Sequence, residues 1–256
     1  MRRIRPLPLV LTALVLGACD EPPPDTELVA DAGDPASSYV AEGTEQVGAA
    51  IAILLDQSGS MEDAVDGGYE PKYRLAREAI ENVLAATDSL AAARPDFPVK
   101  VGLYTFSRRV RQVLPIAPYD PDTLRAALAA LPTPNGGTAI GDAMFEARRD
   151  LYRAGLFRKY LLVVTDGENT HGRAPDRTGR EIHRRSEGAV QMYFVAFDTD
   201  PAKFGFLSEL GGEVIGARDG VELRRALTEI YHGRILAEAD DFGETAEPAP
   251  STGEPR

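Results

Sequence analysis

Between residues 47 and 237 the sequence alternates apolar runs of strand length with longer segments whose apolar residues recur at helical spacing. Ala49–Leu55 is apolar throughout, which is typical of a strand buried on both faces of a parallel sheet. From Pro71 to Pro95 the apolar residues instead recur as on one face of a helix. Strands that alternate with helices predict a doubly wound α/β fold, in which a mostly parallel, Rossmann-like central sheet carries helices on both faces.

The other expected elements continue this alternation. We expect a hairpin from Val99–Phe106 and Arg109–Ile116, whose second strand forms an antiparallel edge of the sheet. Further strands are expected at Tyr160–Thr165, Val190–Phe197 and Glu213–Ala217. Helices are expected at Asp122–Leu131, at Thr138–Ala154, from about Asp176 onward, and at Gly220–Leu236. A body of roughly 190 residues buries ~70% of its extended-chain surface, so this core needs no covalent cross-link to be stable.

Charge and cysteine content exclude several classes of function. The chain has 28 Lys and Arg against 40 Asp and Glu, a formal net charge of −12. Binding to duplex nucleic acid depends on neutralising phosphates, so we expect no nucleic-acid partner. One cysteine among 256 residues leaves neither an intrachain disulfide nor a thiolate cluster for zinc or iron–sulfur.

Residues 1–18 have the layout of an export signal. Three arginines precede an apolar run from Leu7 to Leu16, which is shorter than the ~20 residues needed to cross a bilayer. The segment ends in Leu16-Gly17-Ala18-Cys19, which resembles the lipobox of bacterial lipoproteins. This resemblance implies cleavage after residue 18, acylation of Cys19, and a lipid anchor that holds the protein to a membrane. The alternative for a lone cysteine is a small buried apolar residue.

Acidic segments flank the predicted body. Residues 19–46 carry eight acids, four prolines and no basic residue, and residues 238–256 carry six acids and three prolines. Such segments cannot bury enough apolar surface to offset their ordering entropy, so we expect a disordered tether and a disordered tail. The tether would hold the body away from a membrane of the bacterial cell envelope. Asp20 resembles an inner-membrane retention signal, which favours the periplasmic face of the inner membrane.

Oxygen-bearing side chains are expected to gather at one rim of the sheet. The first strand runs into Asp56-Gln57-Ser58-Gly59-Ser60, and alternate residues of an extended backbone face the same way. A later strand ends in Thr165-Asp166-Gly167, and Thr138 lies where a helix begins. Ligands of doubly wound sheets bind beyond the carboxyl ends of the strands, and hard oxygen donors suit Mg²⁺. The predicted metal ligands are Asp56, Ser58, Ser60, Thr138 and Asp166.

This spacing, D-x-S-x-S followed by T and then by D, resembles the metal-ion-dependent adhesion site of von Willebrand factor A (vWA) domains, and the resemblance covers the whole body. It implies that Ser58, Ser60 and Thr138 approach the ion directly. Asp56 and Asp166 would act largely through water or as charged outer ligands. The resemblance also implies Mg²⁺, with Mn²⁺ or Ca²⁺ as alternatives, and an open coordination place that an Asp or Glu carboxylate of a partner protein fills.

The expected function is therefore that of a lipid-anchored, monomeric domain that binds a protein partner and is not an enzyme. One alternative is a structural or assembly protein of the envelope whose metal site is unused. Another is a Mg²⁺-dependent hydrolase, although the sequence contains no H-E-x-x-H, G-x-S-x-G or P-loop motif, and Ser58 and Ser60 lack an identifiable base. The polar residues at the rim can also be interpreted as caps of a helix or turn.

A basic stripe is expected on the helix that starts near Asp176. Arg177, Arg180 and Arg184 recur at helical spacing and therefore share one side of it. Because the preceding loop leaves the predicted metal rim, this stripe is a candidate contact for an acidic partner. The alternative is an ordinary solvated helix face.

Overall fold

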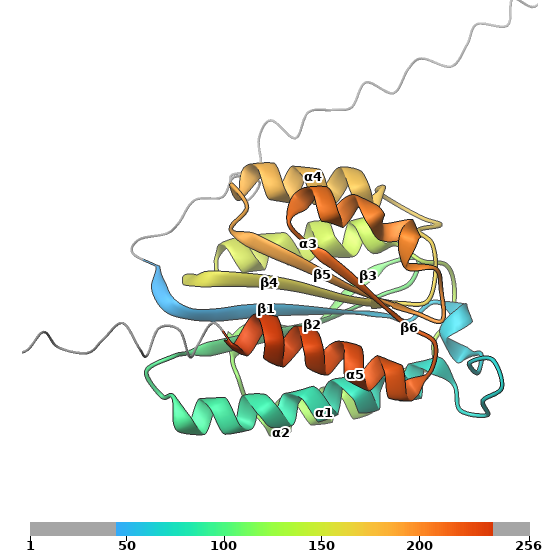
Figure 1. The fold of residues 1–256 in the computed structure, drawn as a ribbon, viewed down its shortest axis with the longest axis horizontal. Coiled ribbons are helices and arrows are strands. Elements are labelled where there is room, and N and C mark those ends of the chain that lie inside the picture. The colour runs from blue at the N-terminus through green and yellow to red at the C-terminus, as the bar shows by residue number, and fades with distance from the viewer. Residues whose placement is uncertain (1–44, 238–256) are drawn as a thin grey trace, which may run out of the picture. The chain divides into compact units, whose positions relative to one another are not determined.

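A six-stranded sheet forms the centre of the described part of the protein (Figure 1). The computed structural model describes residues 45–237. The predicted signal segment, Cys19, the tail and nearly all of the tether lie outside these residues, and their assignments stay predictions. Gln46, expected at the end of the tether, is the first residue of the first strand.

The order of strands in the sheet is β3-β2-β1-β4-β5-β6, and among these pairings only that of β2 with β3 is antiparallel. The strands are β1 (Gln46–Asp56), β2 (Val99–Phe106), β3 (Val110–Pro118), β4 (Leu156–Thr165), β5 (Val190–Phe197) and β6 (Glu213–Ala217). The α-helices are α1 (Lys72–Ala93), α2 (Pro121–Ala129), α3 (Ile140–Tyr152), α4 (Pro175–Arg185) and α5 (Gly220–Ile230). The predicted doubly wound fold and its antiparallel edge strand are confirmed.

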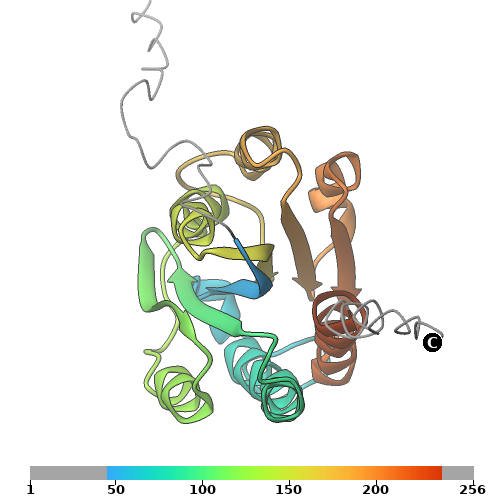
Figure 2. The same cartoon turned by 90° about the vertical axis from the view of Figure 1, so that its left-hand side faces the viewer.

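Helices cover both faces of the sheet, as the end-on view in Figure 2 shows. Along β1, Ile51 and Ile53 point into a core formed with α1, α2 and α5, whereas Ala52 and Leu54 point into a second core formed with α3 and α4. All four side chains are fully buried, and each large aliphatic one contributes about 1.5–3 kcal/mol to folding. The apolar run therefore serves two cores at once. Within residues 45–237, no helix combines the length and apolar character that crossing a bilayer requires.

Two short helices within the described residues were not expected from the sequence. The first, η2 (Gly59–Glu62), follows β1 after a two-residue turn and buries Met61 completely. The second, η3 (Pro201–Leu210), begins at Asp200, whose side chain accepts a hydrogen bond from the Ala202 N–H. Both are 3₁₀ segments: η2 has only four residues, and η3 is bent at Phe204, so neither produces a run of α-helical periodicity in the sequence.

The last predicted helix changes type before it ends. It is α-helical only as far as Ile230 and continues as a π-helical turn, η4 (Tyr231–Leu236). The wider turn keeps Tyr231, Ile235 and Leu236 buried together. The Tyr231 hydroxyl lies 2.7 Å from the Thr87 hydroxyl of α1, so a hydrogen bond joins η4 to α1.

The sheet reverses its winding direction at β1, and this position determines where a ligand can bind. The chain leaves β1 for β2 on one side, and β4 lies on the other. In doubly wound sheets the crevice at such a point, beyond the carboxyl ends of the strands, is the usual binding place. Asp56 is the last residue of β1, and Asp166 directly follows Thr165, the last residue of β4. Both predicted carboxylates therefore lie at this rim. In Figure 1 the rim is the right-hand end of the sheet, beside the cyan η2.

One glycine contact couples α3 to the loop that follows β4. A side-chain carbon at Gly141 would lie 2.1 Å from the backbone oxygen of Arg173. We expect Gly141→Ala to destabilise the protein by about 1–3 kcal/mol, because that backbone must move to admit a methyl group. Chemical denaturation of the full chain measures this change.

The matched control is Gly205→Ala, since a side-chain carbon at Gly205 would meet nothing within 4 Å. Equal free energies of unfolding for the two variants would contradict the close contact at Gly141.

Candidate metal centre

Asp56 ends β1 with its carboxylate buried at the rim. One oxygen accepts a hydrogen bond from the Thr165 hydroxyl at 2.6 Å, and the other accepts one from the Ser58 N–H at 2.7 Å. Burial raises the pKa of Asp56 to about 7, although these hydrogen bonds act in the opposite direction. No ion pair joins Asp56 to any residue among 45–237. The ionised carboxylate therefore lacks a nearby cation that would offset the cost of its burial.

Two serines extend the oxygen cluster from Asp56 toward solvent. The hydroxyl oxygens of Ser58 and Ser60 lie 3.2 Å apart, and the Ser60 hydroxyl donates a hydrogen bond of 2.8 Å to Asp166. Ser58 is buried, whereas Ser60 is exposed. The cluster is therefore continuous from the end of β1 to the end of β4 and opens to solvent at Ser60.

Two backbone hydrogen bonds fasten the glycine-rich loop before Thr138 to the end of β1. The Asn135 N–H donates to the Gln57 carbonyl and the Gly59 N–H donates to the Gly136 carbonyl, each at 2.9 Å. Gly136 has φ +88°, a conformation that favours glycine. The loop is thus held against the serine-bearing turn, although the two segments are far apart in sequence.

Thr138 borders the same space as Ser60. A side-chain carbon at Gly167 would lie 3.9 Å from the Thr138 hydroxyl oxygen and 4.0 Å from that of Ser60. The Thr138 N–H donates to the Thr170 hydroxyl at 2.9 Å, and its carbonyl accepts the Thr170 N–H at 2.8 Å. These bonds fix the backbone of Thr138 and leave its own hydroxyl at the rim.

Lys72, the first residue of α1, lies beside the cluster. Its ammonium nitrogen is 2.9 Å from Asp166 and 3.1 Å from Asp198, and its side chain is 9% exposed. Burial lowers the pKa of Lys72, but the hydrogen bonds and charges of Asp166 and Asp198 outweigh this effect and raise it above its usual value. Asp198 has φ 52°, a left-handed conformation that Asp tolerates better than most residues. Asp166 is therefore shared between Ser60 and a buried cation.

The structure brings all five predicted ligands to this rim. The cluster consists of two carboxylates and three hydroxyls. It therefore differs from a site made of His, Cys, Asp or Glu alone, and residues 45–237 contain no group of three or more such residues placed to hold a metal. Ser58 precedes η2 and Ala139 precedes α3, and neither side chain caps the helix that follows. The oxygen donors and the buried, uncompensated Asp56 fit a small divalent cation such as Mg²⁺.

Three residues of the site escaped the sequence prediction: Thr165, Lys72 and Asp198. The sequence shows Thr165 beside Asp166, but its hydrogen bond to Asp56 exists only because β4 pairs with β1, which the sequence alone does not predict. Lys72 and Asp198 had no comparable signal, because a lysine at a helix start and an aspartate after a strand are usually solvated.

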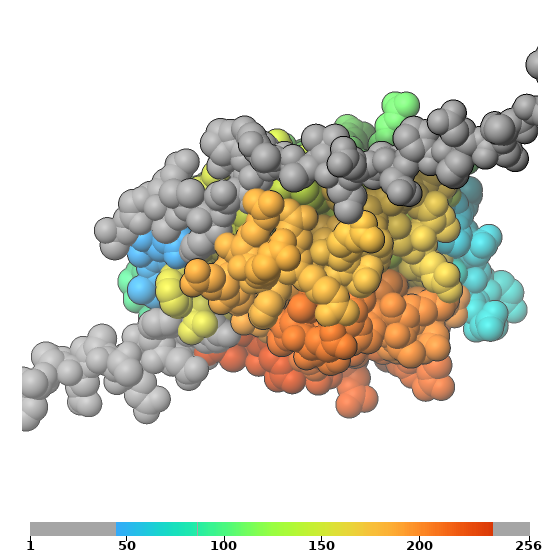
Figure 3. Space-filling model, turned by 90° about the horizontal axis from the view of Figure 1, so that it is seen from above, coloured from blue at the N-terminus to red at the C-terminus, as the bar shows by residue number. Residues whose placement is uncertain are grey.

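The basic stripe on α4 is only partly available to a partner. Arg180 forms an ion pair of 2.5 Å with Glu209 of η3, and Figure 3 shows the gold surface of α4 beside the orange surface of η3. Arg177 and Arg184 are exposed and make no ion pair with another described residue. Their role in partner binding stays a prediction.

Residues 51–168 match the family model of the von Willebrand factor type A domain. This match includes the whole candidate metal centre except Lys72's partner Asp198. Together with the doubly wound sheet, it shows that the chain contains a vWA domain.

Three proteins resemble this chain in sequence or fold at low sequence identity. The chain is 24% identical over 206 residues to the uncharacterized protein YwmC of Bacillus subtilis (strain 168). This alignment covers 75% of this chain and 88% of that relative. The PilB minor pilin from Streptococcus sanguinis has a TM-score of 0.62 at 14% identity, over 79% of this chain and 64% of the pilin chain. An aerotolerance-related membrane protein from Bacteroides fragilis NCTC 9343, carrying multiple mutations to serines, has a TM-score of 0.56 at 18% identity, over 73% and 99%. At these identities the two structures show the fold alone.

The raised pKa of Asp56 predicts that Mg²⁺ affinity depends on pH. Protons compete for the carboxylate below its folded pKa of about 7, so we expect affinity to fall roughly tenfold from pH 8 to pH 6. Calorimetry measures this change. Because the folded pKa lies above the usual value of 3.8, the metal-free protein should lose stability as pH rises from about 4 to about 7, and saturating Mg²⁺ should remove that loss. An affinity independent of pH between 6 and 8 would exclude Asp56 from the ion's environment.

The ion pair between Lys72 and Asp166 predicts competition with a bound metal. We expect Lys72→Met to raise Mg²⁺ affinity about tenfold, because an adjacent cation disfavours a second one on the same carboxylate. The variant should also melt at a lower temperature without metal, since Asp166 and Asp198 lose their shared counterion. Lys203→Met is the matched control, because Lys203 pairs with Glu168 at 3.1 Å on the surface. A weaker Mg²⁺ affinity in Lys72→Met than in this control would contradict the competition.

Proposed function

We propose that this protein is associated with the bacterial cell envelope through a lipid on Cys19, and that its vWA domain binds a protein partner through a divalent cation, Mg²⁺, at the rim of the sheet. The observation that supports this most strongly is the oxygen cluster around Asp56. It combines a buried carboxylate that has no counterion within residues 45–237 with hydroxyls that open to solvent at Ser60.

The residues that would hold the ion are Asp56, Ser58, Ser60, Thr138 and Asp166. Three of these five donors are neutral hydroxyls, so a divalent charge there would be only partly compensated and would provide a place for an Asp or Glu carboxylate of the partner. Thr165 and the Ser58 N–H orient Asp56, and Thr170 orients the backbone of Thr138. Lys72 neutralises part of the charge of Asp166 and so keeps the rim from becoming strongly anionic.

The envelope context rests on two kinds of support. The amino-terminal sequence ends in a lipobox-like segment at Cys19. Proteins that share the fold include a minor pilin and an aerotolerance-related membrane protein. We infer that the domain acts in adhesion or assembly at the membrane as a monomer, with no catalytic step of its own.

Asp56→Asn tests the proposal with little change in shape. We expect the variant to lose measurable Mg²⁺ binding in calorimetry, because an amide removes the charge that the ion would offset, while the fold persists. Capture of the partner from an envelope extract by the full chain should require Mg²⁺, cease with EDTA, and be lost in this variant.

Asp66→Asn is the matched control, since Asp66 is exposed and has no partner among the described residues. Unchanged Mg²⁺ affinity in Asp56→Asn would overturn the metal site. Capture that persists in EDTA would instead indicate an envelope protein whose rim is not used for binding.

A further inference from the structure

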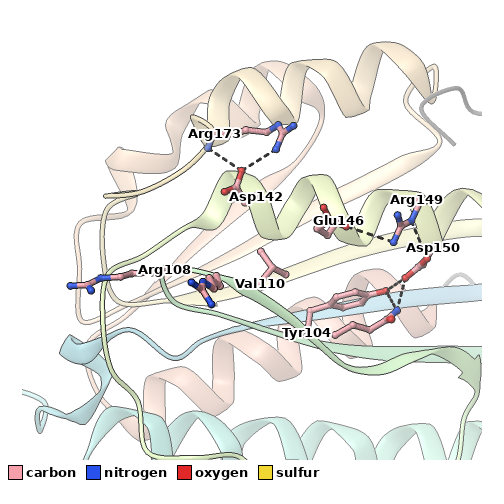
Figure 4. A pocket seen from close by; sticks show the side chains of 10 residues that line it. Tyr104, Arg108, Val110, Asp142, Glu146, Arg149, Asp150 and Arg173 are labelled. Carbon is pink, nitrogen blue, oxygen red and sulfur yellow. Dashed lines mark hydrogen bonds and ion pairs between the residues drawn. The ribbon is translucent and has the colours of Figure 1, made fainter. Parts of the chain in front are cut away.

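A hollow of about 360 Å³ lies beside the candidate metal centre, between the β2–β3 turn and helix α3. Figure 4 shows its lining side chains, which are mostly charged. Four of them are arginines and three are acids: Arg108, Arg109, Arg149 and Arg173, and Asp142, Glu146 and Asp150. The hollow is therefore locally basic, although the chain as a whole has a net charge of −12.

The acids of the hollow already have partners. Asp142 accepts hydrogen bonds from the backbone N–H of Arg173 at 3.1 Å and from its guanidinium at 3.2 Å. Glu146 lies 3.6 Å from Arg149. Asp150 accepts hydrogen bonds from the Tyr104 hydroxyl at 2.5 Å and from the Gln112 amide at 2.6 Å. The carboxylates inside the hollow are thus committed to the helix and the loop around it.

The two arginines of the β2–β3 turn differ from the other charged residues that line the hollow. Arg108 and Arg109 are exposed, and neither makes an ion pair or hydrogen bond through its guanidinium with another described residue. In Figure 4 the Arg108 side chain extends away from the acids of α3. Adjacent like charges repel each other, so this turn gains stability when an anion binds to both.

Backbone contacts place this turn directly beside the proposed metal site. The Gln57 N–H, between two of the candidate ligands, donates to the Phe106 carbonyl at 2.7 Å. The stem of Arg108 covers Gly136, where a side-chain carbon would lie 3.4 Å from its Cγ. The Gly136 carbonyl in turn accepts the Gly59 N–H at 2.9 Å. Arg108 therefore contacts the loop that carries Thr138.

We propose that Arg108 and Arg109 bind a second carboxylate of the partner segment whose first carboxylate completes the metal site. The occupant is thus an acidic protein segment with two Asp or Glu residues close in sequence. This inference rests on the proposed function and adds a requirement to it. One acidic residue of the partner is enough to complete the metal site, whereas the arginines of the hollow favour a partner with a second acidic residue.

The physical basis is linkage of two weak contacts. An exposed arginine–carboxylate pair contributes little when it forms alone. Once the first carboxylate is held at the rim, the second is confined near the turn at a high effective concentration, so its binding costs little additional entropy. Arginine guanidinium also presents paired N–H donors that match a carboxylate.

The test uses isotope-labelled full chain titrated with synthetic Gly/Ser peptides in Mg²⁺. One peptide carries a single glutamate, and otherwise identical peptides carry a second glutamate at increasing spacing. We expect the best two-glutamate peptide to bind about fivefold more tightly than the single-glutamate peptide. It alone should shift the amide resonances of residues 107–110 in addition to those of Gly136 and Gly167.

Arg108→Gln/Arg109→Gln keeps the side-chain stems, including the contact with Gly136, and removes both charges. We expect this variant to bind both peptides with the affinity of the single-glutamate peptide. Arg153→Gln/Arg225→Gln is the matched control, because both arginines are exposed, do not line the hollow and make no ion pair with another described residue. It should retain the fivefold preference.

The outcomes separate this inference from the function on which it rests. If no peptide binds more tightly in Mg²⁺ than in EDTA, the proposed function itself fails. If the single-glutamate peptide binds with Mg²⁺ but no second glutamate improves affinity, only the role of the arginines is overturned. Loss of the preference in the control variant would overturn it as well, since net charge alone would then explain the effect. Inorganic phosphate that binds residues 107–110 more tightly than the best peptide would overturn the assignment to a carboxylate.

Discussion

The burial of the Asp56 carboxylate is the constraint on which the candidate site depends. An ionised carboxylate is costly in an apolar interior unless hydrogen bonds or a cation compensate it. The protein supplies the hydrogen bonds, from Thr165 and from the Ser58 N–H, but the buried ammonium of Lys72 pairs with Asp166 instead. These hydrogen bonds lower the pKa of Asp56 but do not fully offset the effect of burial, which raises it. A divalent ion is the simplest group that provides the remaining compensation from the solvent side.

Charge around the rim is distributed so that an approaching acid meets little repulsion. Lys72 offsets Asp166 and Asp198 from beneath, and the arginines of the β2–β3 turn stand at the side. The donors that reach toward solvent are mainly hydroxyls, which carry no formal charge. In a chain with an excess of acids, the docking of an acidic partner that we propose would require such an arrangement.

The sequence predicts both the sheet and the five candidate ligands at its rim, because both follow from the positions of the apolar runs. Apolar runs such as Ala49–Leu55 indicate buried strands. Polar residues placed just after such runs lie at the carboxyl ends of the strands. What it does not predict depends on contacts between distant segments. Lys72 reaches Asp166 only because the first turn of α1 lies beside the end of β4. The ion pair of Arg180 likewise depends on Glu209 of a 3₁₀ helix that the sequence did not indicate. The π-helical end of α5 likewise follows from packing against Thr87 rather than from local periodicity.

The described chain enters and leaves at the end of the sheet that is remote from the rim. β1 starts there at Gln46, and α5 runs back from the rim to η4, whose Tyr231 lies against the far half of α1 (Figure 1). Both ends of the described chain therefore lie at one end of the sheet, and the docking surface that we propose lies at the other. If the anchor that we propose lies before Gln46, the connection to it joins the domain at the end opposite the rim, and its length limits how far from a membrane the rim can reach.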